Sequence, residues 1–196
     1  MRAKMKQLIF ILAPLIMLST SMGYAESPLD VKTSNPADGF IIGIPKHWNE
    51  KVYPTEKGTT YAYWDNIGNA LTITVREPNS FKKVLTMIND NKFNIKQLKM
   101  LENNFKQDAP LKQKLTLSIE TISNQKSLAQ SYLYRHETAG LIWFSRNKQF
   151  EFIKNGKQYQ ISFSPSPSKT EEAAEIMFNN SYRNIFYPIL ITFFLK

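Results

Sequence analysis

The stretch Gln149–Ser164, QFEFIKNGKQYQISFS, decides the fold. At its centre, Asn155 and Gly156 supply the two positive-φ positions of a type I′ turn, which suits the twist of a tight β-hairpin. The turn joins strands that we expect at 149–153 and 158–164. Strands joined by so short a turn must run antiparallel. The sequence therefore predicts an antiparallel sheet in this part of the chain.

Period-two alternation predicts further strands on the N-terminal side of the hairpin. Between 70 and 76, Leu71, Ile73 and Val75 alternate with threonines, as in a strand with one buried face. Other β-prone runs lie elsewhere in the chain. We expect them at 40–44, 59–65, 115–120, 128–137 and 141–146.

The hydrophobic period changes to that of a helix in two places. Apolar residues at i, i+3, i+4 and i+7 predict two helices, or one kinked helix, over 80–107. Ser168 and Glu171 form a capping box that predicts a helix running to about Asn184, with Ala173, Ile176 and Met177 buried. Because the helices lie between runs of strands, the pattern indicates an α+β fold in one domain.

The first 25 residues have the three parts of a cleaved secretory signal. Arg2, Lys4 and Lys6 precede an apolar run from Leu8 to Leu18, and a more polar stretch ends at Ala25. The apolar run is too short to span a bilayer, which takes about 20 residues. We therefore expect export, with cleavage near Ala25 and a periplasmic or secreted product.

The remaining chain divides into three parts. A polar stretch with two prolines, residues 26–38, predicts a linker, and a single domain follows at 39–186. The apolar tail, residues 187–196, is interrupted by Pro188. We expect the tail either to add an edge strand or to dock in a groove.

Charge and composition narrow the class of partner. The whole chain has 25 Lys and Arg against 16 Asp and Glu, and removing the three cations of the leader leaves 22, a net charge of +6. Export argues against nucleic acid, and so does the predominance of Lys over Arg, since base and phosphate recognition favours the guanidinium fork. The chain has no cysteine, so disulfides and thiol chemistry are excluded.

No motif in the sequence predicts catalysis. The two histidines, His47 and His136, lack the spacing of a zinc site, and there is no G-x-S-x-G nucleophile motif. We assign no catalytic residue, no metal ligand and no cofactor. A small hydrolase or metal-assisted enzyme using His47 or His136 stays open as an alternative, because folding brings distant side chains together.

Two sets of residues are candidates for partner binding. The segment 81–114 has eight lysines against three acids, and five of the lysines are expected on the water-facing side of the helices. These five fit an anionic lipid, an envelope polysaccharide or an acidic protein. In the strand at 59–65, two tyrosines face one side and a tryptophan faces the other, so one side is available to a partner. The candidates are Lys82, Lys83, Lys92, Lys96, Lys99, Tyr61, Tyr63 and Trp64.

Three short motifs carry a resemblance to a known family. They are the strand that ends in Pro45-Lys46-His47-Trp48, the hairpin Asn155–Phe163 and the closing helix that ends in Asn184-Ile185-Phe186. In this layout the chain resembles the PsbP-like family of the photosystem II extrinsic subunit and its bacterial relatives. The resemblance implies an α/β/α sandwich, in which helices flank a central antiparallel sheet, and a non-enzymatic accessory role. It carries over no site residues, because the matching positions are core and turn positions.

The leading expectation is an exported, non-enzymatic binding or accessory protein of the cell envelope. It would dock on a protein or an anionic surface. Peripheral contact with a membrane stays open, and we expect no nucleic-acid partner. Two alternatives remain: the enzyme described above, and a structural envelope component that assembles through its tail at 187–196.

Overall fold

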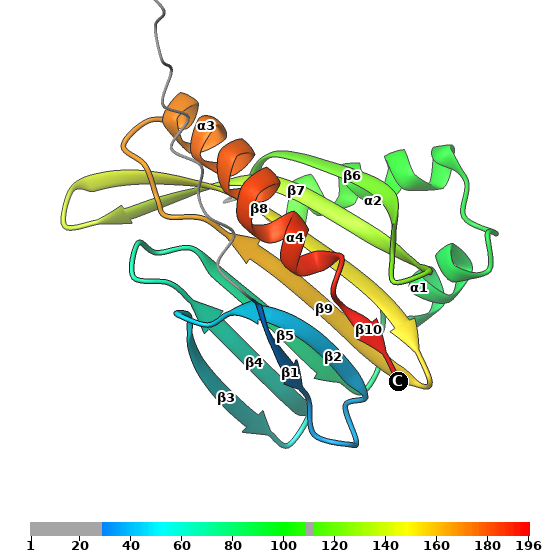
Figure 1. Ribbon diagram of the computed structural model, residues 1–196. Coiled ribbons are helices and arrows are strands. Elements are labelled where there is room, and N and C mark those ends of the chain that lie inside the picture. Colours follow the sequence, from blue (N-terminus) through cyan, green and yellow to red (C-terminus); the bar gives the residue numbers. More distant parts are fainter. Residues whose placement is uncertain (1–28, 109–111) are drawn as a thin grey trace, which may run out of the picture.

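The computed structural model describes residues 29–108 and 112–196, so the expected signal peptide at 1–25 lies outside the described residues. A seven-stranded antiparallel sheet forms the centre, in the order β3-β4-β5-β9-β8-β7-β6 (Figure 1). Its strands are β3 (Asn49–Thr55), β4 (Gly58–Trp64), β5 (Ala70–Arg76), β6 (Lys112–Ile122), β7 (Gln125–Thr138), β8 (Leu141–Lys154) and β9 (Lys157–Ser164).

Two turns of this sheet depend on particular residues. Asn155 and Gly156 join β8 to β9 with φ angles of 50° and 76°, which confirms the predicted hairpin. Gly58 begins β4 at a φ of 155°, and a Cβ placed there would lie 2.2 Å from the carbonyl oxygen of Val75. A side chain at position 58 would therefore collide with the backbone of β5.

One face of the main sheet is covered by a second, smaller sheet and by the C-terminal helices (Figure 1). The core between these layers is rich in aromatic rings, and Phe40 packs at 4.9 Å from the ring of Tyr61 and at 5.6 Å from that of Phe193. The covering elements are β1 (Leu29–Thr33), β2 (Phe40–Pro45), β10 (Phe194–Leu195), α3 (Glu171–Ser181), the π-helical turn η1 (Tyr182–Phe186) and α4 (Tyr187–Leu190).

The opposite face is partly covered by α1 (Lys82–Asn89) and α2 (Ile95–Asp108), which lie behind the sheet in Figure 1. Leu85, Ile88 and Leu98 are buried there with Leu117 and Leu128. Leu128 precedes Ala129, which belongs to the aromatic core, and successive residues of a strand face opposite sides. The fold is α+β, as predicted, but half of one flanking layer is sheet rather than helix.

The expected linker is partly a strand. Within 26–38, Leu29–Thr33 forms β1 and pairs antiparallel with β2, from Leu29 opposite Pro45 to Thr33 opposite Ile41. The structure also has β3, which we did not predict. Both are edge strands that pair through backbone groups, so neither needs the alternating apolar side chains by which sequence analysis finds strands.

The tail does both things that we expected of it. Phe194 and Leu195 pair with β2 as an edge strand, and Ile189, Leu190 and Phe193 are buried in the core. The chain reaches Pro188 through η1, where the N–H of Tyr187 donates to the carbonyl of Tyr182 five residues earlier. The wider turn precedes a proline, which cannot donate to the preceding turn of helix.

The last helix begins later than predicted. Thr170, rather than Ser168, caps α3, with its Oγ1 accepting from the N–H of Ala173 at 3.1 Å. Ser168 instead exchanges two backbone hydrogen bonds with Phe144, which fixes it beside β8. The predicted buried face of this helix is also wrong: Ala174, Phe178 and Ser181 are buried, rather than Ala173, Ile176 and Met177.

Candidate functional site

The five predicted lysines all lie exposed on the helical layer. Lys82 and Lys83 are on α1, Lys92 is in the connection, and Lys96 and Lys99 are on α2. Lys92 pairs with Asp90 at 3.1 Å. The other four form no ion pair with a carboxylate of residues 29–108 or 112–196. Their charges are therefore open to a partner.

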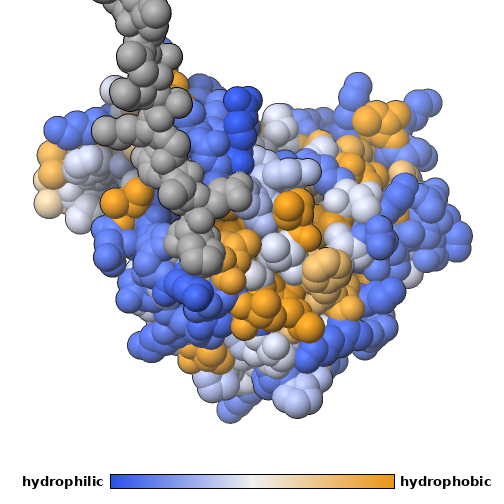
Figure 2. All heavy atoms as spheres, viewed as in Figure 1, coloured by the Kyte–Doolittle hydropathy of each residue, from blue (hydrophilic) through white to orange (hydrophobic). Residues whose placement is uncertain are grey.

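The outer side of α2 combines these charges with exposed apolar side chains. Ile95 and Met100 are 65% and 67% exposed. Ile95 lies four residues before Lys99, and Met100 lies four residues after Lys96, so these pairs neighbour each other on the outer side of the helix. Leu98 lies on the other side and packs on the sheet. We call Ile95, Lys96, Lys99 and Met100 the α2 docking face. Figure 2 shows mostly hydrophilic residues at the edge formed by α1 and α2, with isolated hydrophobic residues among them.

Two of the three aromatic candidates are not available to a partner. Tyr61 and Tyr63 are 4% and 2% exposed, because the smaller sheet covers their side of β4. The hydroxyl of Tyr61 donates to Asp38 at 2.9 Å and accepts from the N–H of Asn35 at 3.0 Å. Burial raises the pKa of Tyr61 to about 12. Trp64 lies on the opposite side of β4 and is half-buried, so it alone of the three stays on an accessible face.

The two histidines lie on different elements. His47 is exposed in the turn between β2 and β3, and His136 is on β7, with its ring 4.5 Å from that of Tyr134. His136 Nε2 lies 3.0 Å from the Oγ of Ser145. Ser145 is buried, and Asn147 Nδ2 also donates to its Oγ at 3.1 Å. Among the residues that the structure describes, no group of three or more His, Cys, Asp or Glu could hold a metal ion.

Strand β8 carries a line of buried polar side chains that was not predicted from the sequence. These residues alternate along the strand and lie on the side that carries α1 and α2, opposite the aromatic core. We call them the polar track. Its members are Ser145, Asn147, Gln149 and Glu151.

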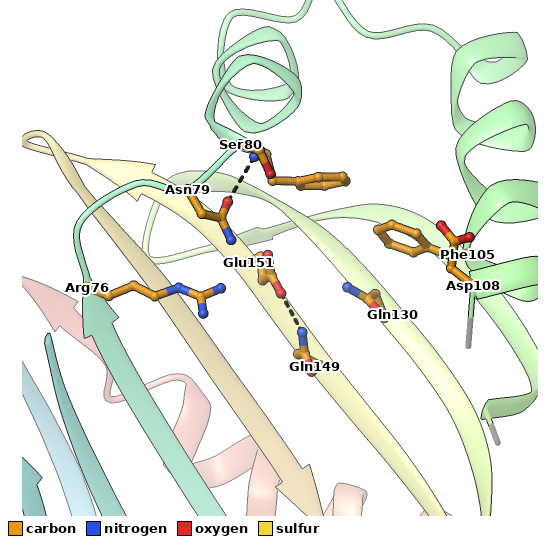
Figure 3. A pocket seen from close by; sticks show the side chains of 9 residues that line it. Arg76, Asn79, Ser80, Phe105, Asp108, Gln130, Gln149 and Glu151 are labelled. Atoms are coloured by element: carbon orange, nitrogen blue, oxygen red, sulfur yellow. Dashed lines mark hydrogen bonds between the residues drawn. The ribbon is translucent and has the colours of Figure 1, made fainter. Parts of the chain in front are cut away.

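A pocket of about 300 Å³ lies at one end of the polar track, between the main sheet and the helical layer (Figure 3). Arg76 and Gln130 line it beside Gln149 and Glu151. On the helical side, the rings of Phe81 and Phe105 stack with centroids 5.4 Å apart. The pocket thus has a polar floor and an aromatic wall.

Two amide side chains hydrogen-bond to the carboxylate of Glu151 in this pocket. Gln149 Nε2 donates to one oxygen of Glu151 at 2.5 Å, and Gln158 Nε2 donates to the other at 3.2 Å. Arg76 reaches toward them from β5 (Figure 3). Its Nε is buried and has no hydrogen-bond partner within the described parts of the chain. A free buried donor therefore lies beside the pocket.

A second pocket, of about 240 Å³, lies at the other end of the polar track. Tyr134 and His136 line it from β7, Ser145 and Asn147 from β8, and Ser162 from β9. Its surface offers hydroxyl, amide and imidazole groups. Both pockets therefore lie on the same side of the main sheet and are joined by alternate residues of one strand.

No protein-family model matches the chain, and no curated protein matches it. Two solved structures of low identity are among those similar to this chain. One is a protein of Bacteroides thetaiotaomicron VPI-5482, with 11% sequence identity and a TM-score of 0.45. The match covers 87% of this chain, and this chain spans about half (49%) of that protein's length. The other is LpqN of Mycobacterium tuberculosis, which is described as involved in cell envelope biogenesis. It has 8% sequence identity to this chain and a TM-score of 0.42, and the match covers 86% of this chain and 91% of LpqN.

Proposed function

We propose that this chain is an exported, non-enzymatic binding protein of the cell envelope that docks on an anionic membrane surface. The observation that carries the proposal is the α2 docking face, where exposed Ile95 and Met100 lie beside Lys96 and Lys99. A helix with basic residues and exposed apolar residues on one side suits the interface of a membrane with anionic headgroups.

The distribution of charge supports this orientation. The segment 81–114 carries a formal charge of +5, which is nearly all of the +6 expected for the exported chain. Each lysine near an anionic membrane contributes about 1 kcal/mol to binding. Ion pairs use some of these charges, as Lys106 pairs with Glu102 and Lys114 with Glu171. The four unpaired lysines then dominate the attraction.

The accessory role rests on the resemblance to the PsbP-like family and on the expected leader. Relatives in that family generally act by binding a larger partner rather than by catalysis. None of the helices in residues 29–108 and 112–196 is both long and apolar enough to cross a membrane. Contact through the α2 docking face would be peripheral.

The two alternative functions, an enzyme and a structural envelope component, have less support. The pair formed by His136 and Ser145 has the distance of a nucleophile and its base. The serine is buried, however, and its hydroxyl also accepts from Asn147, two residues along the same strand. Assembly through the tail would use Ile191 and Phe194, which are exposed, whereas Ile189, Leu190 and Phe193 pack in the chain's own core.

Co-sedimentation with vesicles tests the proposal. We expect the chain from Glu26 onward to bind vesicles of phosphatidylglycerol and phosphatidylcholine, and to ignore vesicles of phosphatidylcholine alone. The double substitution Lys96→Gln/Lys99→Gln should lower the partition coefficient about 30-fold, because two lysines contribute about 1 kcal/mol each. Binding should also weaken as salt is raised, since exposed charges are screened.

A variant with the same net charge provides the matched control. Lys154 and Lys169 are also exposed but lie away from the helical layer, on the β8–β9 hairpin and before α3. Lys154→Gln/Lys169→Gln should bind vesicles nearly as well as the unchanged chain. If both double variants lose binding equally, net charge rather than the α2 docking face is responsible, and the proposal is wrong.

A further inference from the structure

Strand β1 lies at an edge of the smaller sheet, with β2 on one side of it and no strand on the other (Figure 1). Gly43 of β2, which pairs with Val31, donates its N–H to Thr192 Oγ1 at 2.7 Å, on the side away from β1. Val31 and Gly43 are therefore a non-hydrogen-bonded pair, and the N–H and C=O of Val31 point to the free edge. Three pairs further along, the N–H of Ser34 donates to the carbonyl of Phe40, as this alternation requires.

The side chains of β1 alternate between the two sides of the smaller sheet. Within β2, Ile42 and Ile44 face the aromatic core. Their partners in the pairing, Lys32 and Asp30, therefore lie on the same inner side, and both stay partly exposed at the edge. Val31, between them, lies on the outer side and is 74% exposed. Both sides of the strand are thus accessible along its free edge.

The other edge strands of the two sheets are protected in ways that β1 is not. Native proteins protect edges with prolines, bulges, very short strands or covering groups. Strand β3 contains Pro54, and β10 has two residues. Strand β6 has a bulge, and its Leu117 N–H donates to Glu102 at 2.9 Å. Strand β1 pairs in unbroken register over five residues without a proline, so its free edge is the one best suited to add a strand.

The charges of β1 are complementary to those of a second β1 strand. When two copies pair antiparallel with Val31 opposite Val31, Asp30 of each copy lies opposite Lys32 of the other. These are non-hydrogen-bonded pairs, with Cα atoms about 4.5 Å apart and side chains close together. The next register in either direction places Asp30 opposite Asp30 or Lys32 opposite Lys32, and like charges directly opposite are destabilising. The charges therefore select a second copy in one register.

The partners that these charges have within the chain do not prevent this pairing. Lys32 lies 3.0 Å from Glu50, and Asp30 lies 3.8 Å from Lys46. All four side chains are partly exposed, and ion pairs of this kind contribute little to stability. A carboxylate and an ammonium group each accommodate more than one partner.

We propose that β1 pairs antiparallel with β1 of a second copy of this chain, centred on Val31, to form a symmetric dimer. Leu29 of each copy then pairs with Thr33 of the other, and the two three-stranded sheets become one continuous sheet. Stable complexes bury roughly 1,600 Å², and two five-residue strands supply only part of that, so we expect a Kd of about 10–100 µM. The α2 docking face lies on the opposite side of the main sheet and stays uncovered, so this inference goes beyond membrane docking.

Sedimentation velocity of the chain from Glu26 onward tests the dimer. Between about 5 µM and 1 mM, we expect the sedimentation coefficient to rise from that of a monomer to that of a dimer. Val31→Pro removes an N–H that points to the free edge, which an edge strand tolerates, and should abolish the dimer. Val31→Thr, which keeps the N–H and the branched side chain, is the matched control and should still dimerise. The thermal unfolding midpoint of each variant shows whether it is folded.

Exchanging the two charges tests the register. Asp30→Lys and Lys32→Asp each place like charges opposite one another at two positions, and each should weaken the dimer about tenfold. The double variant Asp30→Lys/Lys32→Asp places each introduced lysine opposite an introduced aspartate of the other copy, so dimerisation should return. Within one chain the same exchange loses both the contact with Glu50 and that with Lys46, so an effect on folding alone would add up rather than be reversed.

The remaining outcomes overturn the proposal. A chain that stays monomeric up to 1 mM does not pair through β1, and its free edge then serves another protein or none. If the chain dimerises but folded Val31→Pro dimerises equally well, another surface forms the contact. If the double variant is as weak as the single ones, the two strands do not pair in this register. Vesicle binding is measured separately, so its loss leaves the result for the dimer intact.

Discussion

The hydroxyl of Tyr61 links the turn between β1 and β2 to the main sheet by two hydrogen bonds. It bonds to Asp38 and to the backbone N–H of Asn35, while the hydroxyl of Tyr159 donates to the carbonyl of Asp38 at 2.8 Å. Two strands of the main sheet thus hold the turn that links β1 to β2. Because Tyr61 and Asp38 are buried, the hydrogen bond between them contributes to stability.

Substituting Tyr61 by Phe should lower the free energy of unfolding by about 2 kcal/mol, since it removes a hydrogen bond to the buried Asp38 carboxylate and one from the N–H of Asn35. Urea denaturation followed by circular dichroism measures the change. Tyr53, exposed on β3, offers the same substitution without buried partners, and Tyr53→Phe should change stability by less than about 0.5 kcal/mol. Equal effects of the two substitutions would show that the hydroxyl network contributes nothing.

The tyrosines also show what sequence reasoning could determine at the residue scale. Alternation on β4 correctly placed Tyr61 and Tyr63 on one side and Trp64 on the other. Which side would be covered depended on β2 and on Phe193, far away in the chain. A pattern within one strand carries no information on that distant cover, so the two tyrosines were wrongly expected to be available to a partner.

The tail is the element that closes the aromatic core. Phe193 lies against Phe40 and Phe152, with ring centroids 5.6 Å and 6.2 Å apart. The side-chain hydroxyl of Thr192 accepts from the N–H of Gly43 at 2.7 Å, which fixes the tail to β2. The last residues of the chain are therefore part of the fold.

Adjacent phenylalanines in the tail allow a paired test. Phe193 is 1% exposed and Phe194 is 58% exposed. Phe193→Ala should lower the free energy of unfolding by about 3–5 kcal/mol, the cost of a large cavity in a core. Phe194→Ala should lower it by less than about 1 kcal/mol, since its side chain leaves little apolar surface buried. Urea denaturation compares them, and a small effect of Phe193→Ala would show that the tail is not packed as described.

Elements with strong local signals were predicted, and those held by distant partners were not. The β8–β9 hairpin follows from Asn155 and Gly156, and the two helices of 80–107 follow from their apolar period. By contrast, β1 has only five residues and its Val31 is 74% exposed, so its place in the fold depends on pairing with β2. The expected capping box at Ser168 competed with the cap at Thr170, and the backbone bridge to Phe144 favoured the later start.

At the scale of the whole molecule, the central sheet has the aromatic core on one side, and on the other side it has both the apolar cluster under α1 and α2 and the polar track. The exposed lysines could be predicted, because a helical period assigns polar residues to the outer side of an amphipathic helix. The polar track could not, because a polar residue that alternates with apolar ones reads as solvent-facing. Its burial arises only when β7, β9 and the helical layer pack around β8.

The aromatic core also sets how the molecule responds to alkaline pH. Burial raises the pKa of Tyr61 to about 12, and burial, with a contribution from Glu120, raises the pKa of Tyr182 to about 12. Burial also raises the pKa values of Tyr63 and Tyr159. These groups stay protonated in the folded state over a pH range in which the unfolded chain, with a tyrosine pKa of 10.0, has lost the protons.

These tyrosines should therefore not affect the free energy of unfolding below pH 10. Between pH 10 and 12 the free energy of unfolding should fall, because the unfolded state is stabilised by releasing protons that the folded state retains. Urea denaturation at a series of alkaline pH values measures the slope, and tyrosinate absorbance should rise together with unfolding. Within this pH range each such tyrosine contributes about 1.4 kcal/mol per pH unit to the fall in the free energy of unfolding.

The substitution Tyr61→Phe removes one of these tyrosines. The free energy of unfolding of this variant should therefore fall less steeply with pH, by about that contribution, even though the variant is less stable at neutral pH. Identical slopes would mean that Tyr61 ionises as readily in the folded chain as in the unfolded one, which is incompatible with its burial beneath the smaller sheet.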